Sequence, residues 1–139
     1  MTDLEIVRKV VREKAQTILN ANDRIWEYAE LAYHEFQSAD LLCNILSEEG
    51  FTVQKGLAGI PTCFTATWSK GSGKPVMGIL GEYDALSSLS QKAATPTAEP
   101  IEQGGNGHGC GHCSLGAGAL GAVLAIKAYL EEQDEDGTV

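Results

Sequence analysis

The stretch from residue 104 to residue 113 restricts the fold of this chain more than any other part of it. Five glycines are interleaved there with four side chains that can bind a metal ion, His108, Cys110, His112 and Cys113. Glycine lets a backbone approach an ion closely and adopt unusual dihedral angles, and thiolate and imidazole are usual ligands of zinc and similar metals. The stretch therefore predicts a metal-binding loop. The helical pattern that follows predicts a helix whose positive end points at this loop.

Spacing alone leaves other interpretations of this loop open. The Cys-x-x-Cys pair formed by Cys110 and Cys113 is also typical of a redox dithiol, although a thioredoxin-like βαβ context is missing. The four side chains have the chemistry of a closed structural zinc site, but they are crowded more tightly than the usual paired zinc knuckles. A glycine-rich turn with incidental cysteine and histidine explains any one of these residues but not the cluster. Metal binding is therefore the preferred interpretation.

Hydrophobic periodicity predicts helices in the first third of the chain and at its end. Apolar residues recur at helical spacing over residues 3–20, where polar residues break the pattern before a further helical stretch. The next helix covers residues 35–49 and ends at Gly50. The last helix covers residues 114–132 with Ser114 as its N-cap, and its interior glycines predict close packing on a sheet. The acidic tail after it is expected to fray.

Past Gly50 the apolar pattern changes to strict alternation, which predicts strands. They cover residues 51–54, 62–68 and 76–80. The last is nearly all apolar, as expected for a strand buried on both faces, and the short connection before it predicts an antiparallel hairpin with residues 62–68. The expected architecture is α/β, with helices packed on a mixed sheet that contains a hairpin, in a single domain over residues 1–139.

Two carboxylates follow the apolar strand. Glu82 and Asp84 come just after a predicted central strand, which is where α/β folds carry their catalytic and binding residues. Solvated turn acids or a helix cap would leave the same pattern. Residues 87–107 are polar and glycine-rich without a clear period, and a loop that long in a compact domain is usually functional or mobile. Together with the glycine-rich stretch, these features place the candidate site at the C-terminal edge of the sheet.

Charge and composition exclude several classes of partner. The net charge of −9 argues against nucleic acid or an anionic membrane surface, because either would need a basic patch. The first residues carry acids rather than the bases of a secretory signal, and no run reaches the roughly 18 apolar residues that span a bilayer. We therefore expect a soluble cytoplasmic protein with neither nucleic-acid nor membrane partners, whose cysteines are free thiols or metal ligands.

Residues 81–91 and 104–112 together carry a recognisable pattern. They read Gly-Glu-Tyr-Asp-Ala-Leu-Ser-Ser-Leu-Ser-Gln and Gly-Gly-Asn-Gly-His-Gly-Cys-Gly-His. This pattern closely resembles the aminobenzoyl-glutamate utilisation protein B group of the metal-dependent aminoacylase and carboxypeptidase-like amidohydrolases. Residues 30–36 and 56–62 resemble the same group, so that the resemblance extends over roughly residues 22–131.

The resemblance implies a role for each candidate ligand. Cys110 and His112 match two metal ligands of the family, and His108 matches a histidine that shapes the pocket without binding the ion. Cys113 stands where the family has Asp or Asn, so it would add a ligand, change the preferred metal or have no effect. The implied cofactor is a divalent metal ion, Zn or Mn.

The resemblance also implies roles for the two acids. Glu82 matches the acid that orients a metal-bound histidine, a common arrangement around metal ligands. Asp84 matches the second acid of the same motif. Both are therefore expected to act on the site without binding the ion themselves.

A fold and an activity follow from the same resemblance. The chain would be the N-terminal portion of a zinc-exopeptidase-like catalytic domain, with the lid and dimerisation domain, the catalytic glutamate and further metal ligands beyond residue 139. The implied reaction is hydrolysis of the amide bond of N-acyl amino acids, such as p-aminobenzoyl-glutamate, or of dipeptides. The isolated chain is expected to be inactive and to act as a homo-oligomer or with a complementing C-terminal partner. The alternative is a non-enzymatic zinc-binding or interaction module built on Cys110, Cys113, His108 and His112.

Overall fold

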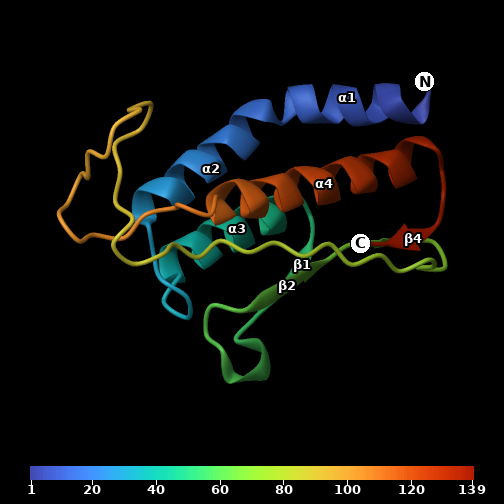
Figure 1. Cartoon of the computed structure of the whole chain (residues 1–139). Coiled ribbons are helices and arrows are strands. Elements are labelled where there is room, and N and C mark those ends of the chain that lie inside the picture. The colour runs from blue at the N-terminus through green and yellow to red at the C-terminus, as the bar shows by residue number, and fades with distance from the viewer.

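The computed structural model describes residues 1–139 and contains four α-helices and four short strands. In chain order these elements are α1 (Asp3–Glu13), α2 (Ala15–Tyr28), α3 (Phe36–Glu48), β1 (Thr52–Lys55), the 3-10 turn η1 (Leu57–Gly59), β2 (Phe64–Thr67), β3 (Ser69–Lys70), α4 (His112–Glu132) and β4 (Gly137–Thr138). Figure 1 shows α1, α2 and α4 along one side of the molecule, with α3 between them and the β1–β2 hairpin. The α/β class predicted from the sequence is confirmed.

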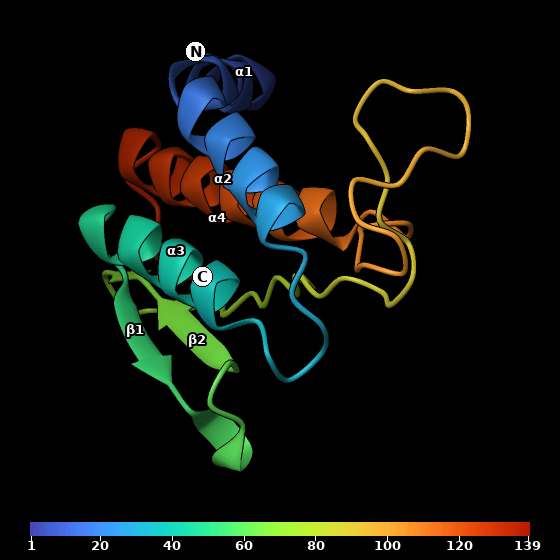
Figure 2. The same cartoon turned by 90° about the vertical axis from the view of Figure 1, so that its left-hand side faces the viewer.

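Helix α4 is the centre of the hydrophobic core. It packs against α1 and α2, while α3 packs against α2 and against both strands of the hairpin, as Figure 2 shows from the side. The buried core cluster consists of Val10, Ala21, Ile25, Leu42, Leu46, Phe51, Cys113, Leu120, Leu124, Ala125 and Val139. By length and composition α4 would pass for a membrane-spanning helix, a test that core helices of globular proteins also pass. Here its buried face forms the middle of the core.

Two helices replace the single helix predicted over residues 3–20. The first is interrupted at Lys14, and α2 begins directly after it and continues through the polar residues that were expected to break the pattern. That predicted break is wrong because Ala21 and Ile25, which are 1% and 0% exposed, keep the helical face buried in the core. Their burial outweighs the weak helix propensity of the neighbouring Asn and Asp residues.

Helix α3 confirms the helix predicted for residues 35–49, and Gly50 after it has the left-handed φ of 87° that terminates many helices. A carboxylate from outside the helix caps its first turn. Glu30 accepts hydrogen bonds from the backbone N–H of Gln37 (2.9 Å), the N–H of Ser38 (2.9 Å) and the Ser38 hydroxyl (2.8 Å). These bonds satisfy donors that a helix leaves unpaired at its N-terminus, and they hold the connection between α2 and α3.

The hairpin is present, but its strands differ from those predicted. β2 pairs antiparallel with β1, from Thr52 opposite Thr67 to Lys55 opposite Phe64. Residues 76–80 form no strand, and of them only Val76 takes part in a backbone bridge. Val76 is 71% exposed and Leu80 is 93% exposed, so the predicted burial on both faces is wrong. An apolar run is buried only where a neighbour covers it, and no strand lies between β2 and residues 77–80.

The acidic tail is tied down rather than frayed. β4 pairs antiparallel with β3 and so forms a second two-stranded sheet. Lys70 reaches Asp134 at 2.7 Å, and Asp136 accepts a hydrogen bond from the backbone N–H of Ser72 at 2.8 Å. Val139 is 7% exposed and belongs to the core. The expectation of fraying is wrong because the tail has both a strand partner and an apolar anchor.

Helix α4 begins earlier than the sequence predicted. Gly111, with φ of 85°, is its N-cap, so His112 is the first helical residue and the predicted cap Ser114 lies inside the helix. The predicted close packing occurs, but not on a sheet. A Cβ added to Gly116 would lie 3.1 Å from the carbonyl oxygen of Glu82, so that glycine lets the helix approach the segment that carries the two acids.

Candidate active site

The candidate site lies at the N-terminal end of α4, where the segment after residue 81 passes the first helical turn. The N–H of Ala85 donates to the Glu30 carbonyl at 2.7 Å, and Leu86 and Gly107 exchange two backbone hydrogen bonds at 3.0 and 2.9 Å. A Cβ on Gly107 would lie 2.0 Å from the Leu89 carbonyl oxygen, so only glycine permits this approach. Residues 81–91 and 104–112, which carry the family-like sequence pattern, are therefore held together by backbone hydrogen bonds.

The imidazole of His112 lies between the two predicted acids. Its Nδ1 is 2.8 Å from Asp84 Oδ1, and its Nε2 is 3.0 Å from Glu82 Oε2. The Asp84 side chain is 22% exposed, whereas that of Glu82 is 64% exposed. A neutral imidazole carries only one N–H. Two carboxylates on its two nitrogens therefore suit either an imidazolium or an imidazole with a cation near one nitrogen.

Tyr83 lies between the two acids in sequence and anchors them. Side chains alternate along an extended segment, so Glu82 and Asp84 reach the same imidazole while Tyr83 points elsewhere. Its hydroxyl donates to the Thr62 carbonyl, and its ring packs against Phe64 with centroids 6.1 Å apart. Burial, with a smaller contribution from nearby acids, raises the pKa of this hydroxyl. Tyr83 was not among the residues predicted for the site, although the Glu-Tyr-Asp alternation was the available signal.

The two cysteines of the loop are separated by the start of the helix. Cys110 precedes the N-cap and is exposed with a free thiol, next to the positive end of α4. Cys113 is 5% exposed and belongs to the hydrophobic core. The thiols of this Cys-x-x-Cys pair therefore lie in different environments, one accessible before the first turn of α4 and the other packed among apolar side chains.

His108 faces α2 and not the acids. Its Nε2 donates to the Ile25 carbonyl at 2.9 Å, and its Nδ1 is buried without a hydrogen-bond partner. Burial lowers the pKa of His108, and the bond to Ile25 opposes this effect in part. The side chain lines a cavity of about 480 Å³ between the end of α2 and the long loop, beside Trp26 and Leu89. His108 is thus a pocket residue in this structure.

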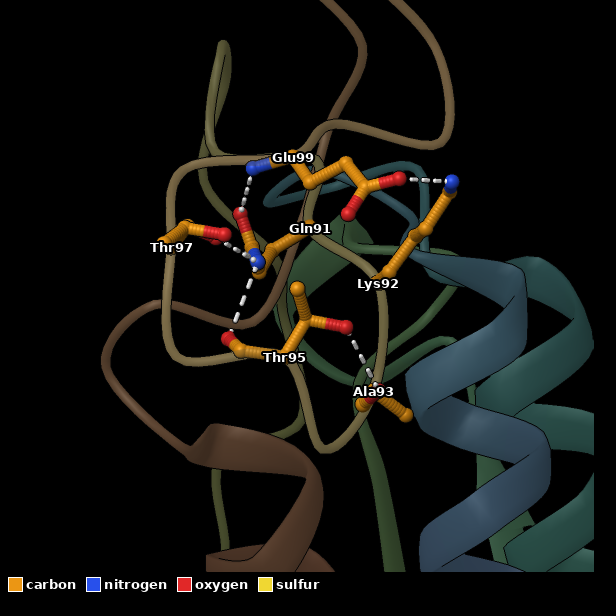
Figure 3. Close-up of polar contacts among 6 residues, drawn as sticks. All are labelled: Gln91, Lys92, Ala93, Thr95, Thr97 and Glu99. Atoms are coloured by element: carbon orange, nitrogen blue, oxygen red, sulfur yellow. Dashed lines mark hydrogen bonds and ion pairs between the residues drawn. The ribbon is translucent and has the colours of Figure 1, made fainter.

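The long loop over residues 87–107 is held together by its own side chains. Figure 3 shows Gln91 at its centre, where the side-chain amide donates to the carbonyls of Thr95 and Thr97 and accepts from the Glu99 N–H. Lys92 forms an ion pair with Glu99 in the same loop. Figure 2 shows this loop projecting from the helical body beside the start of α4. It forms one wall of the cavity that His108 lines.

The side chains around His112 form an incomplete ligand set for a divalent metal ion. Over residues 1–139 no group of three or more His, Cys, Asp and Glu side chains has the arrangement of a metal centre. The chemistry that is present nevertheless fits such an ion in part. Cys110 supplies an accessible thiol two residues before His112 in the chain, and a carboxylate lies on each imidazole nitrogen. The chain thus offers part of a ligand set and its supporting acids.

Over 117 residues the chain is 45% identical to one of the subunits of the p-aminobenzoyl-glutamate hydrolase of Escherichia coli (strain K12), a match that covers 84% of this chain and 24% of the relative. The chain belongs to the aminoacylase and carboxypeptidase-like hydrolase family. Two further members of this family are more distant. The Xaa-Arg dipeptidase of Mus musculus is 30% identical over 142 residues, covering 93% of this chain and 29% of the relative.

The thermostable carboxypeptidase 1 of Saccharolobus solfataricus is 27% identical over 125 residues, covering 89% of this chain and 31% of the relative. The chain therefore spans between 24% and 31% of the length of these hydrolases and peptidases. No family model matches it.

Proposed function

We propose that this chain provides part of the metal site of an amidohydrolase that cleaves the amide bond of N-acyl amino acids of the p-aminobenzoyl-glutamate type. The observation that carries the proposal is the imidazole of His112 between the carboxylates of Glu82 and Asp84, two residues after the exposed Cys110 in the chain. The names of the relatives, a p-aminobenzoyl-glutamate hydrolase subunit, a dipeptidase and a carboxypeptidase, support the reaction class.

In this proposal Cys110 and His112 are ligands of a Zn or Mn ion. Asp84 accepts the Nδ1–H of His112 and so fixes the tautomer whose Nε2 lone pair, on the side where Glu82 Oε2 lies at 3.0 Å, would bind the ion. Asp84 suits this positioning role better than Glu82, because its side chain is the less exposed of the two. Glu82 contributes negative charge on the Nε2 side of the ring.

The bound ion would polarise the scissile carbonyl and lower the pKa of an attacking water. Hydrolysis also needs a general base, and this chain offers no free carboxylate beside His112, because Glu82 and Asp84 both contact the imidazole. We therefore propose that the 139-residue chain alone does not turn over substrate. A complementing chain or a homo-oligomer would supply the base, and the naming of the Escherichia coli relative as a subunit supports the first arrangement.

The ligand assignment is tested by metal retention. The purified chain is loaded with Zn or Mn, dialysed against metal-free buffer and analysed by plasma mass spectrometry. Cys110→Ser and His112→Asn are expected to lose the ion, and Asp84→Asn to weaken retention about 10- to 100-fold. The matched controls are Cys63→Ser and His34→Asn, because these residues lie outside the site. Equal retention by the wild type and the His112 variant would contradict the assignment.

The activity proposal is tested separately with p-aminobenzoyl-glutamate. We expect no release of p-aminobenzoate from the purified chain with either metal, and release once a complementing chain is added. Robust turnover by the chain alone would contradict the proposal that its base is supplied from elsewhere. That result would not affect the assignment of Cys110 and His112 as metal ligands, which the retention experiment tests independently.

The alternative of a zinc module on His108, Cys110, His112 and Cys113 is less favoured by the geometry. His108 donates to Ile25 and Cys113 is packed in the core, so both would have to move to reach an ion. Under this alternative Cys113→Ser would lose one equivalent of zinc and unfold. Under the proposed function Cys113→Ser retains the metal, so the same variant separates the two.

A further inference from the structure

The cavity that His108 lines is separate from the candidate metal site. It lies between the C-terminal end of α2 and the long loop, which Figure 2 shows beside each other, and its volume is about 480 Å³. Cavities that hold small molecules have volumes of about 300–1,000 Å³. None of Glu82, Asp84, Cys110 and His112 is among its 15 lining residues. The cavity therefore has the size of a ligand site and a lining of its own.

The C-terminal end of α2 brings unpaired carbonyl groups to this cavity. The last three helical residues, Trp26, Glu27 and Tyr28, all line it. Within the chain no hydrogen bond reaches their carbonyl oxygens, whereas the Ile25 carbonyl before them accepts from His108 Nε2 at 2.9 Å. A helix C-terminus carries a partial negative charge, and α2 has no basic residue in its last turn. This end of the cavity therefore favours a cationic group.

The charged side chains of the lining add to its negative character. Glu27 and Glu102 line the cavity, and the one lysine of the lining, Lys92, forms an ion pair with Glu99, as Figure 3 shows. Arg24 reaches Glu27 only at 3.8 Å, and both side chains are more than half exposed, so this pair neutralises little of the charge. Two carboxylates of the lining are thus left without a close cation.

The rest of the lining suits an apolar body. Trp26 packs against the hydrophobic core, and the long loop contributes the exposed side chains of Leu89 and Ile101. The face of an aromatic ring such as the Trp26 indole also attracts a cation. A bare metal ion would leave these apolar side chains in water, and an anion would be repelled by the carboxylates and carbonyls. The lining therefore favours an organic cation.

We propose that this cavity binds a small organic cation, an ammonium or guanidinium group carried on an apolar or aromatic body. The cationic group lies at the α2 end, where it donates to the unpaired carbonyls and is balanced by Glu27 and Glu102. The body lies between Trp26 and the long loop. This proposal does not depend on the metal site, because the two sites share no residue.

The test uses phenethylamine as the probe and phenethyl alcohol as its neutral counterpart of nearly equal size. The chain has two tryptophans, and Trp68 lies outside the cavity beside Lys127, so an NMR titration of the indole N–H signals contains its own control. Phenethylamine is expected to shift the Trp26 signal and not that of Trp68, with a dissociation constant on the order of 1 mM. Phenethyl alcohol should bind at least about fivefold more weakly.

The carboxylates are exposed, so their charge can be removed without disturbing the core. Glu27→Gln and Glu102→Gln should each weaken phenethylamine binding about two- to fivefold and leave phenethyl alcohol binding unchanged. The matched control Glu13→Gln, at an exposed position of α1 outside the lining, should change neither. A lysine blocked at both ends is titrated in parallel. Tighter binding of the blocked lysine assigns the cation to a peptide side chain, and tighter binding of phenethylamine assigns it to a free amine; either result supports a site for organic cations.

Three results would overturn the proposal. Equal affinities for phenethylamine and phenethyl alcohol would show that charge plays no part in binding. An unchanged Trp26 signal with both phenethylamine and the blocked lysine at about 20 mM would show that the cavity accepts no organic cation. Displacement of phenethylamine by calcium chloride, where sodium chloride of equal ionic strength has no effect, would show that a metal ion is the occupant instead.

Discussion

Helix α4 carries Gly116 and Gly118 in the same turn, and the structure predicts opposite effects of replacing each with alanine. A Cβ added to Gly118 meets no atom within 4 Å, and this residue is exposed. Alanine there should deliver the full gain in helix propensity, about 0.5–1 kcal/mol. For a chain of this length, that gain raises Tm by roughly 2–5 °C.

At Gly116 the same gain is opposed by a collision. The added Cβ would lie 3.1 Å from the Glu82 carbonyl oxygen and 3.2 Å from the Tyr83 Cβ. These two atoms, one backbone and one side-chain, belong to a segment that is fixed by the Tyr83 hydroxyl and the Ala85 N–H, so they cannot move aside freely. Overpacking of this kind costs about 1–3 kcal/mol. The expected net effect is a destabilisation on the order of 1 kcal/mol.

Urea denaturation followed by circular dichroism measures both variants against the wild type. Gly116→Ala should also weaken metal retention, because it displaces the backbone that carries Glu82 and Asp84, whereas Gly118→Ala should leave retention unchanged. If Gly116→Ala stabilised the chain as much as Gly118→Ala does, the close approach between α4 and the acid-bearing segment would be refuted.

Three further predictions follow from single contacts. Tyr83→Phe leaves the carbonyl of the buried Thr62 without its donor and should cost about 1–3 kcal/mol in urea denaturation, whereas the exposed Tyr33→Phe should cost nothing measurable. Glu30→Ala removes the three hydrogen bonds that cap α3 and should cost about 1–2 kcal/mol, against no loss for the exposed Glu27→Ala. The hydrogen bond from the Ser72 N–H lowers the pKa of Asp136. The stability that this carboxylate adds to the fold is therefore present above the ordinary aspartate pKa, and it is lost as the pH falls through the lowered pKa. The difference in urea midpoint between wild type and Asp136→Asn should therefore be constant from about pH 5 to 8 and shrink below about pH 4, and a difference that persists in acid would contradict this.

The periodicity of apolar residues predicted those helices and strands whose formation depends mainly on neighbouring residues in the sequence. The helical spacing of residues 35–49 gave α3, and the change of period after Gly50 gave β1 and β2 to within two residues. The errors lie where tertiary contacts decide. Polar residues after position 20 stay helical because Ala21 and Ile25 are buried, and β2 pairs with β1 because of contacts that no short window contains.

The candidate site was accessible from motifs, but its geometry was not. Glu82, Asp84 and His112 were singled out from the sequence, and the contacts among them appear only in the fold. Spacing also could not tell the environments of Cys110 and Cys113 apart. That difference depends on where α4 begins, because successive helical residues point about 100° apart and a start at His112 turns Cys113 into the core.

The failed strand prediction for residues 76–80 has a physical explanation. A run such as Val-Met-Gly-Ile-Leu is typical of a strand covered on both faces, and burying each of its large side chains fully would contribute about 1.5–3 kcal/mol. In this structure Val76, Met77, Ile79 and Leu80 are all exposed because no strand pairs with residues 77–80, so the composition of the run alone could not predict its burial.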